Sequence, residues 1–382
     1  MLGINSNINS LVAQQNLNGS QSALSQAITR LSSGKRINSA ADDAAGLAIS
    51  TRMQTQINGL NQGVSNANDG VSMIQTASSA LSSLTSSLQR IRQLAVQAST
   101  GSLSSSDQAA LQQEVAAQIS EVNRIASQTT YNGTNILDGS AGNVSFQVGA
   151  NVGQTISLNL SQSMSAAKIG GGLVQTGQTV GTVAVSTDAS GVYAATGAAI
   201  TSVNVLSDGK GGFTFTDQNN QALSASAVSG IFSSGAATGS GTAITTLTLS
   251  SALVTAMGAT AGSAATAAVA QIDAINAPPT VSNLNISTVS GANEAMVSID
   301  NALATVNNLQ ASLGAAQNRF TAIATSQQAE STDLSSAQSQ ITDANFAQET
   351  ANLSKAQVLQ QAGISVLAQA NSNPQQVLKL LQ

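Results

Sequence analysis

Cysteine, histidine and tryptophan are absent from this sequence of 382 residues. Without cysteine the chain can form no disulfide and no thiolate metal site. Without histidine it cannot build the two-histidine zinc site of peptidases, a Ser–His–Asp triad or a Cys–His nucleophile. We therefore expect a protein that is not an enzyme, with no catalytic residue, no cofactor and no metal site.

Charge and aromatic side chains are also scarce, at 8% and 2% of the residues. A net charge of −5 with only 12 Lys and Arg excludes a nucleic-acid partner, because binding to nucleic acid depends on many cationic contacts with phosphates. No run of 18 apolar residues is present, so we expect no membrane insertion. The nearest candidate is 356–378, which is uncharged but contains six Gln.

The opening residues "MLGINSNINSLVAQQ" contain no basic region followed by a continuous apolar run, so they do not read as a secretory signal. If the protein works outside the cell, we expect a dedicated export route.

Apolar residues recur every three or four positions from Ile49 to Ala98. This heptad-like pattern predicts a long helix that packs against other helices. Ser39 and Asp42 form an S-x-x-D capping box, which places the start of the helix near residue 40, and Gly101 marks its end. Such a helix is roughly 90 Å long. It exceeds the diameter of roughly 55 Å of a compact chain of this size, which predicts an elongated molecule.

Two further helices are predicted by the same periodicity. One pattern runs from Ile299 to Ile323, and a shorter one from Leu111 to Val122 is opened by "SSSD" at 104–107. The three helices are expected to pack as a bundle.

The two ends of the chain carry weaker apolar patterns: a helical stripe with a phase shift at the N-terminus, and apolar residues that spread over more than one helix face at the C-terminus. A helix that is apolar on several faces is usually buried on several sides, so these ends are expected to pack against other copies of the chain. The residues predicted to drive polymerisation are Ile4, Ile8, Leu11, Leu24, Ile28, Leu31, Phe346, Leu353, Leu359, Val366 and Leu367.

The middle of the chain changes character. Alternating apolar residues around the turn "GANVG" predict a β-hairpin over 141–160. The following segment is rich in Gly, Ser, Ala and Thr, with short alternating runs such as 203–217, and reads as a β-rich domain closed by Pro278 and Pro279. The fold class is mainly α with an inserted β domain, in an elongated multi-domain chain. Its N- and C-terminal helices pair as a coiled coil or helical bundle.

The stretch "RLSSGKRINSAADDAAGLAIS" at 30–50 separates the first helix from the long one. Gly34 is expected to end the first helix, since glycine readily adopts the left-handed conformation that follows a helix. The residues assigned to this joint are Gly34, Lys35, Arg36, Ser39, Asp42 and Asp43. Their charges are expected to solvate a segment that neither helix can bury.

This joint, the N-terminus "MLGINSNINSLVAQQNL" and the C-terminal "FAQETANLSKAQVLQQAGISVLAQAN" closely resemble the signatures of bacterial flagellin. The resemblance covers about 1–165 and 284–382. It implies that 1–40 and 343–382 form an inner tube, that 41–168 and 284–342 form a helical wall, and that 169–283 is a variable outer domain.

The same resemblance implies a structural subunit that polymerises into the flagellar filament for motility. It implies secretion to the extracellular bacterial flagellum by the flagellar type III export apparatus, with an export chaperone holding the C-terminal segment. Further partners are the flagellar cap and hook-junction proteins and, for the monomer, an innate immune receptor.

The segment "QRIRQLAVQ" at 89–97 resembles the one that the flagellin-sensing Toll-like receptor recognises. The matching positions are Gln89, Arg90, Leu94, Gln97 and Glu114. Residues 90, 94 and 97 are spaced to lie on one helix face. The same face could instead pack against the next subunit.

Two other functions share parts of this pattern. A hook–filament junction protein has similar terminal helices, and a secreted adhesin could use the insert to bind a host surface. Growth of long filaments by the purified protein distinguishes the filament subunit from both alternatives.

Overall fold

The computed structural model describes residues 7–172, 174, 176–210, 212–234 and 246–380, with residues 234 and 373–380 described by backbone alone. The chain divides into two compact units. The first comprises 1–68, 147–155 and 322–382, and the second comprises 69–146 and 156–321. Helices α2 (Ala44–Ala98) and α6 (Val289–Thr342) each contribute to both units.

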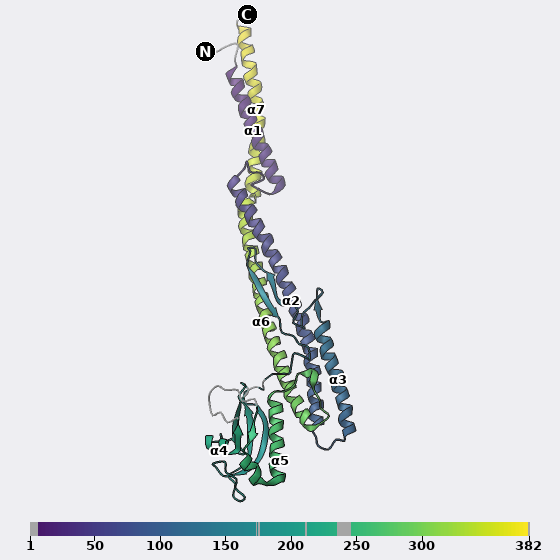
Figure 1. Ribbon diagram of the computed structural model, residues 1–382. Helices are drawn as coiled ribbons and strands as arrows, with labels where there is room; N and C mark the ends of the chain where they lie inside the picture. Colours follow the sequence, from purple (N-terminus) through teal and green to yellow (C-terminus); the bar gives the residue numbers. More distant parts are fainter. Residues whose placement is uncertain (1–6, 173, 175, 211, 235–245, 381–382) are drawn as a thin grey trace. The chain divides into compact units, whose positions relative to one another are not determined.

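Two antiparallel helices from opposite ends of the chain make up much of the first unit. Helices α1 (Ile8–Ser33) and α7 (Phe346–Leu380) lie side by side, with both chain ends at the same end of the pair (Figure 1). The side chain of Asn7 caps α1 by accepting a hydrogen bond from the N–H of Ser10. Gly34 ends α1 in the left-handed conformation with φ of 71°, which confirms the end expected from the sequence.

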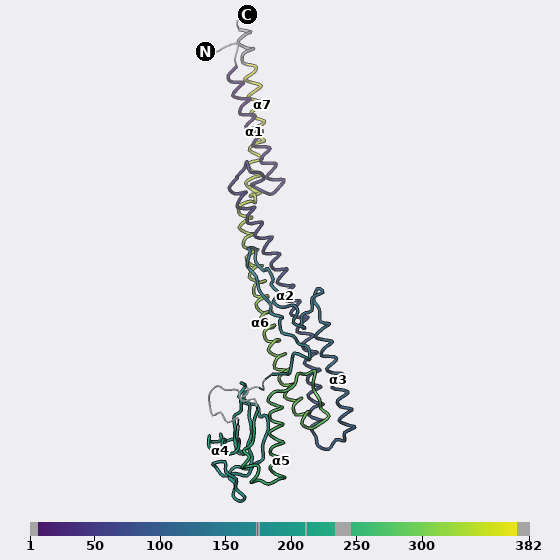
Figure 2. The backbone as a smooth tube through the Cα atoms, in the orientation of Figure 1, coloured from purple at the N-terminus to yellow at the C-terminus, as the bar shows by residue number. Residues whose placement is uncertain are grey.

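The long helix α2 begins at Ala44 and continues unbroken to Ala98 (Figure 2). Its N-cap is Asp43, whose carboxylate accepts the N–H of Gly46 at 2.9 Å. The expectation that Ser39 caps this helix is wrong, because Ser39 and Asp42 close a separate turn before it. Ser39 and Asp43 can each cap a helix, and Asp43 caps α2.

Within the first unit, α2 and α6 are joined by polar contacts. Ser331 donates to Asn61 at 2.9 Å, and Gln338 donates to the carbonyl of Ser50 at 3.0 Å. The hairpin tip 147–155 packs on α2 at Gly63, where a Cβ would collide with the backbone of Val148. A glycine is required there by the close approach of the tip.

The second unit contains the helical bundle expected from the periodicity. Helix α3 (Ser105–Gln128) starts with a complete capping box between Ser104 and Asp107. The apolar positions of the two long seams are buried here, including Leu81, Leu84, Leu88, Ile91, Ile299, Val306 and Leu313. Phe320 packs edge-on against Phe146, with ring centroids 5.3 Å apart.

Short strands follow α3. Strands β1 (Thr130–Tyr131) and β2 (Thr134–Asn135) pair as a two-residue hairpin. Strands β3 (Gly142–Gln147) and β4 (Thr155–Leu160) pair as the longer hairpin predicted over 141–160.

The insert contains an antiparallel sheet of order β5-β6-β7, formed by Thr179–Thr187, Ile200–Ser207 and Phe213–Asp217. It continues through α4 (Ala225–Ile231), β8 (Phe232–Ser234) and β9 (Thr248–Leu249) to α5 (Ser251–Asn276), a helix that packs against β5. A short 3₁₀ helix, η1 (Val281–Asn283), follows. The β-rich insert is confirmed, but the sequence analysis missed α5.

Helix α5 is also the described helix whose length and hydropathy would allow it to cross a membrane, with a mean hydropathy of 1.4. It replaces 356–378 as the most apolar candidate. Its side chains Leu253, Val269, Ile272 and Ile275 are buried in the core of the insert. Burial in the insert covers 22% of the apolar window of this helix.

The chain enters and leaves the insert through two adjacent segments. The N–H of Val281 donates to the carbonyl of Ile169 at 3.0 Å, and the N–H of Ser282 donates to the carbonyl of Ala166 at 3.0 Å. Ser298 of α6 is fully buried and donates to the carbonyl of Pro279 at 2.7 Å. The insert is therefore anchored to α6 within the second unit.

Candidate polymerisation surface

The interface between α1 and α7 is lined by small residues. Ala13, Ala27, Ala356 and Ala370 are the buried apolar residues of these two helices. A Cβ built on Gly363 would lie 3.4 Å from Leu17, which is ordinary van der Waals contact. Alanine and glycine let two helix backbones approach closely, but they bury little apolar area. The pairing therefore leaves many of the larger apolar side chains of both helices exposed.

Many large apolar side chains of α1 and α7 are exposed. Among the described residues, nine large apolar side chains on these two helices are between 50% and 67% exposed: Ile8, Leu11, Val12 and Ile28 on α1, and Phe346, Val358, Leu359, Ile364 and Val366 on α7. A concentration of large exposed apolar side chains on two neighbouring helices is typical of an interaction surface.

Most residues predicted to drive polymerisation lie on this surface. Ile8, Leu11, Ile28, Phe346, Leu359 and Val366 are exposed, whereas Leu24, Leu31, Leu353 and Leu367 are half-buried. Ile4 lies outside the described residues. The sequence analysis did not name Val12, Val358 or Ile364, which are also exposed on these two helices.

Hydrogen bonds at the start of α1 fix its register against α7. The side-chain amide of Asn7 donates to the carbonyl of Ala370 at 2.8 Å. The hydroxyl of Ser10 donates to Asn371 at 2.8 Å. Because both bonds join α1 to α7, a slip of one helix along the other would break them.

The joint residues after α1 bond to the joint between α6 and α7. The N–H of Arg36 donates to the carbonyl of Thr342 at 2.6 Å, and the N–H of Ala344 donates to the carbonyl of Gly34 at 2.9 Å. Lys35 and Asp343 form the antiparallel bridge between them. The two joints of the first unit are thus held as one short ladder.

The charges of the joint have specific partners. The Arg36 guanidinium donates to the carbonyl of Ile341 at 2.6 Å, near the end of α6, where a cation also complements the helix dipole. Asp43 caps α2. The expectation that these charges only solvate the joint is wrong, because they satisfy backbone groups at helix ends.

Arg30 is the centre of an ionic cluster at the same place. Its guanidinium lies 3.8 Å from the Asp42 carboxylate and 4.0 Å from that of Glu349, which is almost fully buried on α7. A hydrogen bond from Gln26, together with bonds from Ser39 and the Asn38 backbone, lowers the pKa of Asp42 below its usual value. The cluster therefore links α1, the joint and α7 while Asp42 stays ionised.

Of the residues predicted to contact an immune receptor, four are at least partly exposed and one is buried. Arg90 on α2 and Glu114 on α3 form a paired salt bridge, with the Arg90 nitrogens 2.8 and 2.6 Å from one carboxylate oxygen. Gln89 and Gln97 are exposed on α2. Leu94 is 1% exposed, so the expectation that it shares an open face with Arg90 and Gln97 is wrong.

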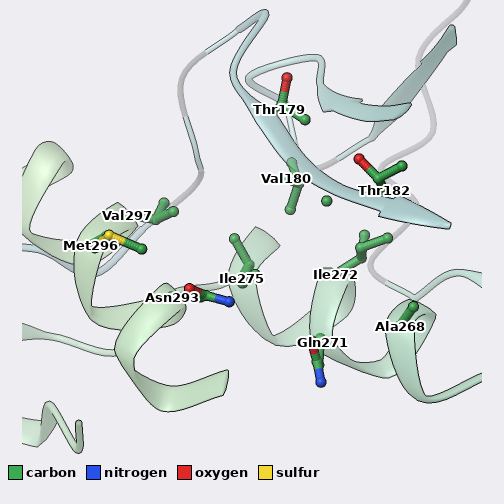
Figure 3. Close-up of a pocket in the computed structure, with 11 residues that line it drawn as sticks. Thr179, Val180, Thr182, Ala268, Gln271, Ile272, Ile275, Asn293, Met296 and Val297 are labelled. Atoms are coloured by element: carbon green, nitrogen blue, oxygen red, sulfur yellow. The ribbon is translucent and has the colours of Figure 1, made fainter. Parts of the chain in front are cut away.

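A pocket of about 310 Å³ lies where β5, α5 and the start of α6 meet (Figure 3). Val180, Ile272 and Ile275 supply apolar side chains, and Thr182, Gln271 and Asn293 supply neutral polar ones. No residue of this lining carries a titratable side chain. The pocket therefore offers no side chain that can act as a general acid or base.

Comparison with known proteins covers almost the whole chain. Family profiles match at 4–142 (bacterial flagellin N-terminal helical region), 172–277 (flagellin, D2 domain) and 296–381 (bacterial flagellin C-terminal helical region). The chain is 37% identical to Flagellin B of Vibrio cholerae over 394 residues, covering 100% of this chain and 99% of the relative. It is also 37% identical to the B-type flagellin of Pseudomonas aeruginosa over 487 residues, covering 100% of both chains.

A solved structure agrees with these matches. The structure of FliC from Burkholderia pseudomallei is 69% identical and aligns with a TM-score of 0.61, covering 66% of this chain and 100% of that one. The family profiles match both helical ends and the insert, and Flagellin B matches over the full length of this chain. The chain belongs to the bacterial flagellin family.

Proposed function

We propose that this structural subunit of the flagellar filament polymerises through the outward apolar side chains of α1 and α7. The observation that supports the proposal is that exposed apolar side chains gather on these two helices. Nine of the fifteen large apolar side chains that are exposed in the described chain lie on these two helices. A secreted adhesin would have no need of a subunit-to-subunit surface that repeats along a fibre. A hook-junction protein shares the terminal helices, and growth of long filaments distinguishes the two.

Burial of this surface would contribute a free energy of the same order as the cost of association. Full burial of one Leu, Ile, Val or Phe contributes about 1.5–3 kcal/mol, and these nine are already about half-buried. Their complete burial would thus contribute about 10 kcal/mol per subunit. That is comparable with the 4–15 kcal/mol that association costs in lost motion, estimated as an order of magnitude.

A matched pair of substitutions tests the surface. Val366→Asp places a charge on α7, and Val192→Asp places the same charge on the insert; the parent side chains are 58% and 63% exposed. We expect Val366→Asp to raise the protein concentration needed for seeded growth strongly, while Val192→Asp grows filaments like the parent chain. Sedimentation and electron microscopy measure both, after circular dichroism has shown equal helix content. Equal growth of the two variants would contradict the proposal.

Secretion and the assembly partners belong to the same proposal. The exposed apolar side chains of α7 would need cover before assembly, which supports an export chaperone that holds the C-terminal segment. The flagellar type III export apparatus would then deliver the chain, and cap and hook-junction proteins would bind the ends of the filament. Loss of chaperone binding by Val366→Asp, with binding retained by Val192→Asp, is the expected result of a pull-down with the export chaperone.

Recognition of the monomer by an innate immune receptor is proposed for the surface around Arg90 and Glu114. Both side chains are partly exposed, and Gln89 and Gln97 lie nearby on α2. Leu94 would act from within the core, by supporting this part of α2. We expect Arg90→Ala to weaken receptor activation by the monomer. Arg124→Ala is the matched control, because Arg124 also pairs with a glutamate, Glu121, on α3.

We propose no catalytic activity and no cofactor for this chain. The sequence contains neither histidine nor cysteine, and the insert's carboxylates Asp188, Asp208 and Asp217 accept backbone hydrogen bonds in their own turns. Their roles are therefore explained by the hairpin turns.

A further inference from the structure

The sequence contains three Asn–Gly pairs: Asn18–Gly19, Asn58–Gly59 and Asn132–Gly133. In such a pair the glycine amide nitrogen can attack the Asn side-chain carbonyl carbon, because glycine has no Cβ to hinder the approach. The new C–N bond closes a succinimide ring and ammonia leaves. Water then opens the ring at either carbonyl, giving Asp or isoaspartate. No enzyme, oxidant or reductant takes part.

Only one of the three pairs lies in a turn. Asn132 and Gly133 are the two loop residues between Tyr131 and Thr134, which pair across the β1–β2 hairpin. Their φ angles are 49° and 78°, as in the tight turns that Asn-Gly favours. Both residues are exposed, and a Cβ on Gly133 would meet nothing within 4 Å. The attacking nitrogen and its target therefore have room to meet.

The reacting groups of this turn are also free of other bonds. Across the described residues, no hydrogen bond engages the Asn132 carboxamide or the Gly133 N–H. The hairpin has only two residue pairs, so it can open locally at little cost. These conditions allow the backbone rotation that ring closure requires.

The other two pairs are held in helices. Asn18–Gly19 lies inside α1 and Asn58–Gly59 inside α2, where the helical backbone bonds fix each glycine nitrogen. The Asn58 side chain also accepts a hydrogen bond from Gln54 at 3.0 Å. A Cβ on Gly59 would lie 2.9 Å from Ala150, so this segment is packed as well.

We propose that Asn132 is a site of spontaneous deamidation, which converts this neutral turn into a carboxylate as the subunit ages. The new charge would lie four residues beyond the end of α3 at Gln128, on the side of the helix dipole that repels anions. The isoaspartate product adds a carbon to the backbone and would break the pairing of Tyr131 with Thr134. Older subunits would therefore carry a looser and more acidic turn.

Peptide mapping by mass spectrometry tests this assignment on the full chain. The purified protein is incubated in mildly alkaline buffer and sampled over time, with Asn18 and Asn58 as internal controls. We expect conversion at Asn132 to be at least about tenfold faster than at either helical site, since those must unfold locally first.

A variant sharpens the result. Asn132→Gln retains an amide but disfavours ring closure, because its longer side chain would have to form a six-membered imide. This chain should lose the early acidic species on isoelectric focusing. Equal rates at the three asparagines would overturn the proposal, and so would persistence of the early acidic species in the variant.

Discussion

The α1–α7 pair and the insert bury opposite kinds of residue. In the pair, the buried apolar residues are alanines, and nine large apolar side chains are at least 50% exposed in the described part of the chain. In the insert, Phe215 stacks on Phe232 at 4.9 Å inside a closed core of valine, isoleucine and leucine. The insert completes its core within one chain, whereas the pair leaves its largest side chains for other copies. Substitution should therefore affect folding in one region and assembly in the other.

Removal of 343–382 should have the largest effect on this contrast. The chain would lose all of α7 and leave the alanine face of α1 uncovered. We expect no filaments after seeding, while the insert still unfolds as it does in the parent chain. Electron microscopy and thermal unfolding report the two properties separately. Normal filaments from this truncation would show that the pair is not the assembly surface.

Two phenylalanines of opposite burial should give the next largest difference. Phe232→Ala removes a fully buried ring and should lower the free energy of unfolding of the insert by about 3–5 kcal/mol. Phe346→Ala removes a ring that is 62% exposed on α7, so it should change stability by less than about 0.5 kcal/mol.

The assembly assay should reverse this order. Phe346→Ala should slow filament growth, and Phe232→Ala should leave it unchanged at temperatures where the insert stays folded. If both variants lost stability equally, the contrast between the two regions would be incorrect.

Deletion of 175–278 should affect assembly less than either change to the pair. The segment contains the sheet and α5, and the chain segments on either side of it are hydrogen-bonded to each other. We expect the deleted chain to form thinner filaments, visible by electron microscopy. Failure to polymerise, with α1 and α7 still helical by circular dichroism, would assign essential contacts to the insert.

The smallest expected effect concerns Asp273 of α5. Burial raises the pKa of this carboxylate, although the Leu247 N–H donates to it at 2.7 Å. A raised pKa means that the folded state binds a proton more tightly than the unfolded state. The stability of the insert should therefore fall as the pH rises from about 4, the ordinary Asp value, through the folded pKa.

Asp273→Asn keeps the oxygen acceptor but removes the charge. At neutral pH the variant should be more stable than the parent by less than about 1 kcal/mol, because solvent screens this partly exposed group. The difference should disappear in acid. Melting temperatures of both chains at acidic and neutral pH measure it, and a gain independent of pH would exclude a charge effect.

Local signals in the sequence were sufficient for much of the fold. The opening of α3 at "SSSD" (104–107) and the end of α1 at Gly34 are each determined by neighbouring residues, and both were predicted correctly. The heptad-like seams were also readable, because each apolar position repeats its environment along the helix. The prediction for Leu94 was wrong. This residue lies beside the seam residues Ile91 and Ala95 and is buried with them.

Helix α5 was missed because its composition resembles that of a loop. Its sequence is dominated by Ala, Ser, Thr and Gly, and Gly258 within it has a non-helical φ of 82°. The helix depends on packing against β5, which no short-range pattern reveals. The alanine interface of α1 and α7 was missed for a related reason, because the large apolar residues were expected to do the packing.

The hydrogen bonds between 166–169 and 281–282 have a practical consequence. They hold the two ends of the insert together independently of what lies between them. A guest domain whose own termini are close could replace 175–278 at small entropic cost, since closing a longer loop adds little free energy. This position is therefore a natural place to graft enzymes or antigens for display in dense arrays along a fibre.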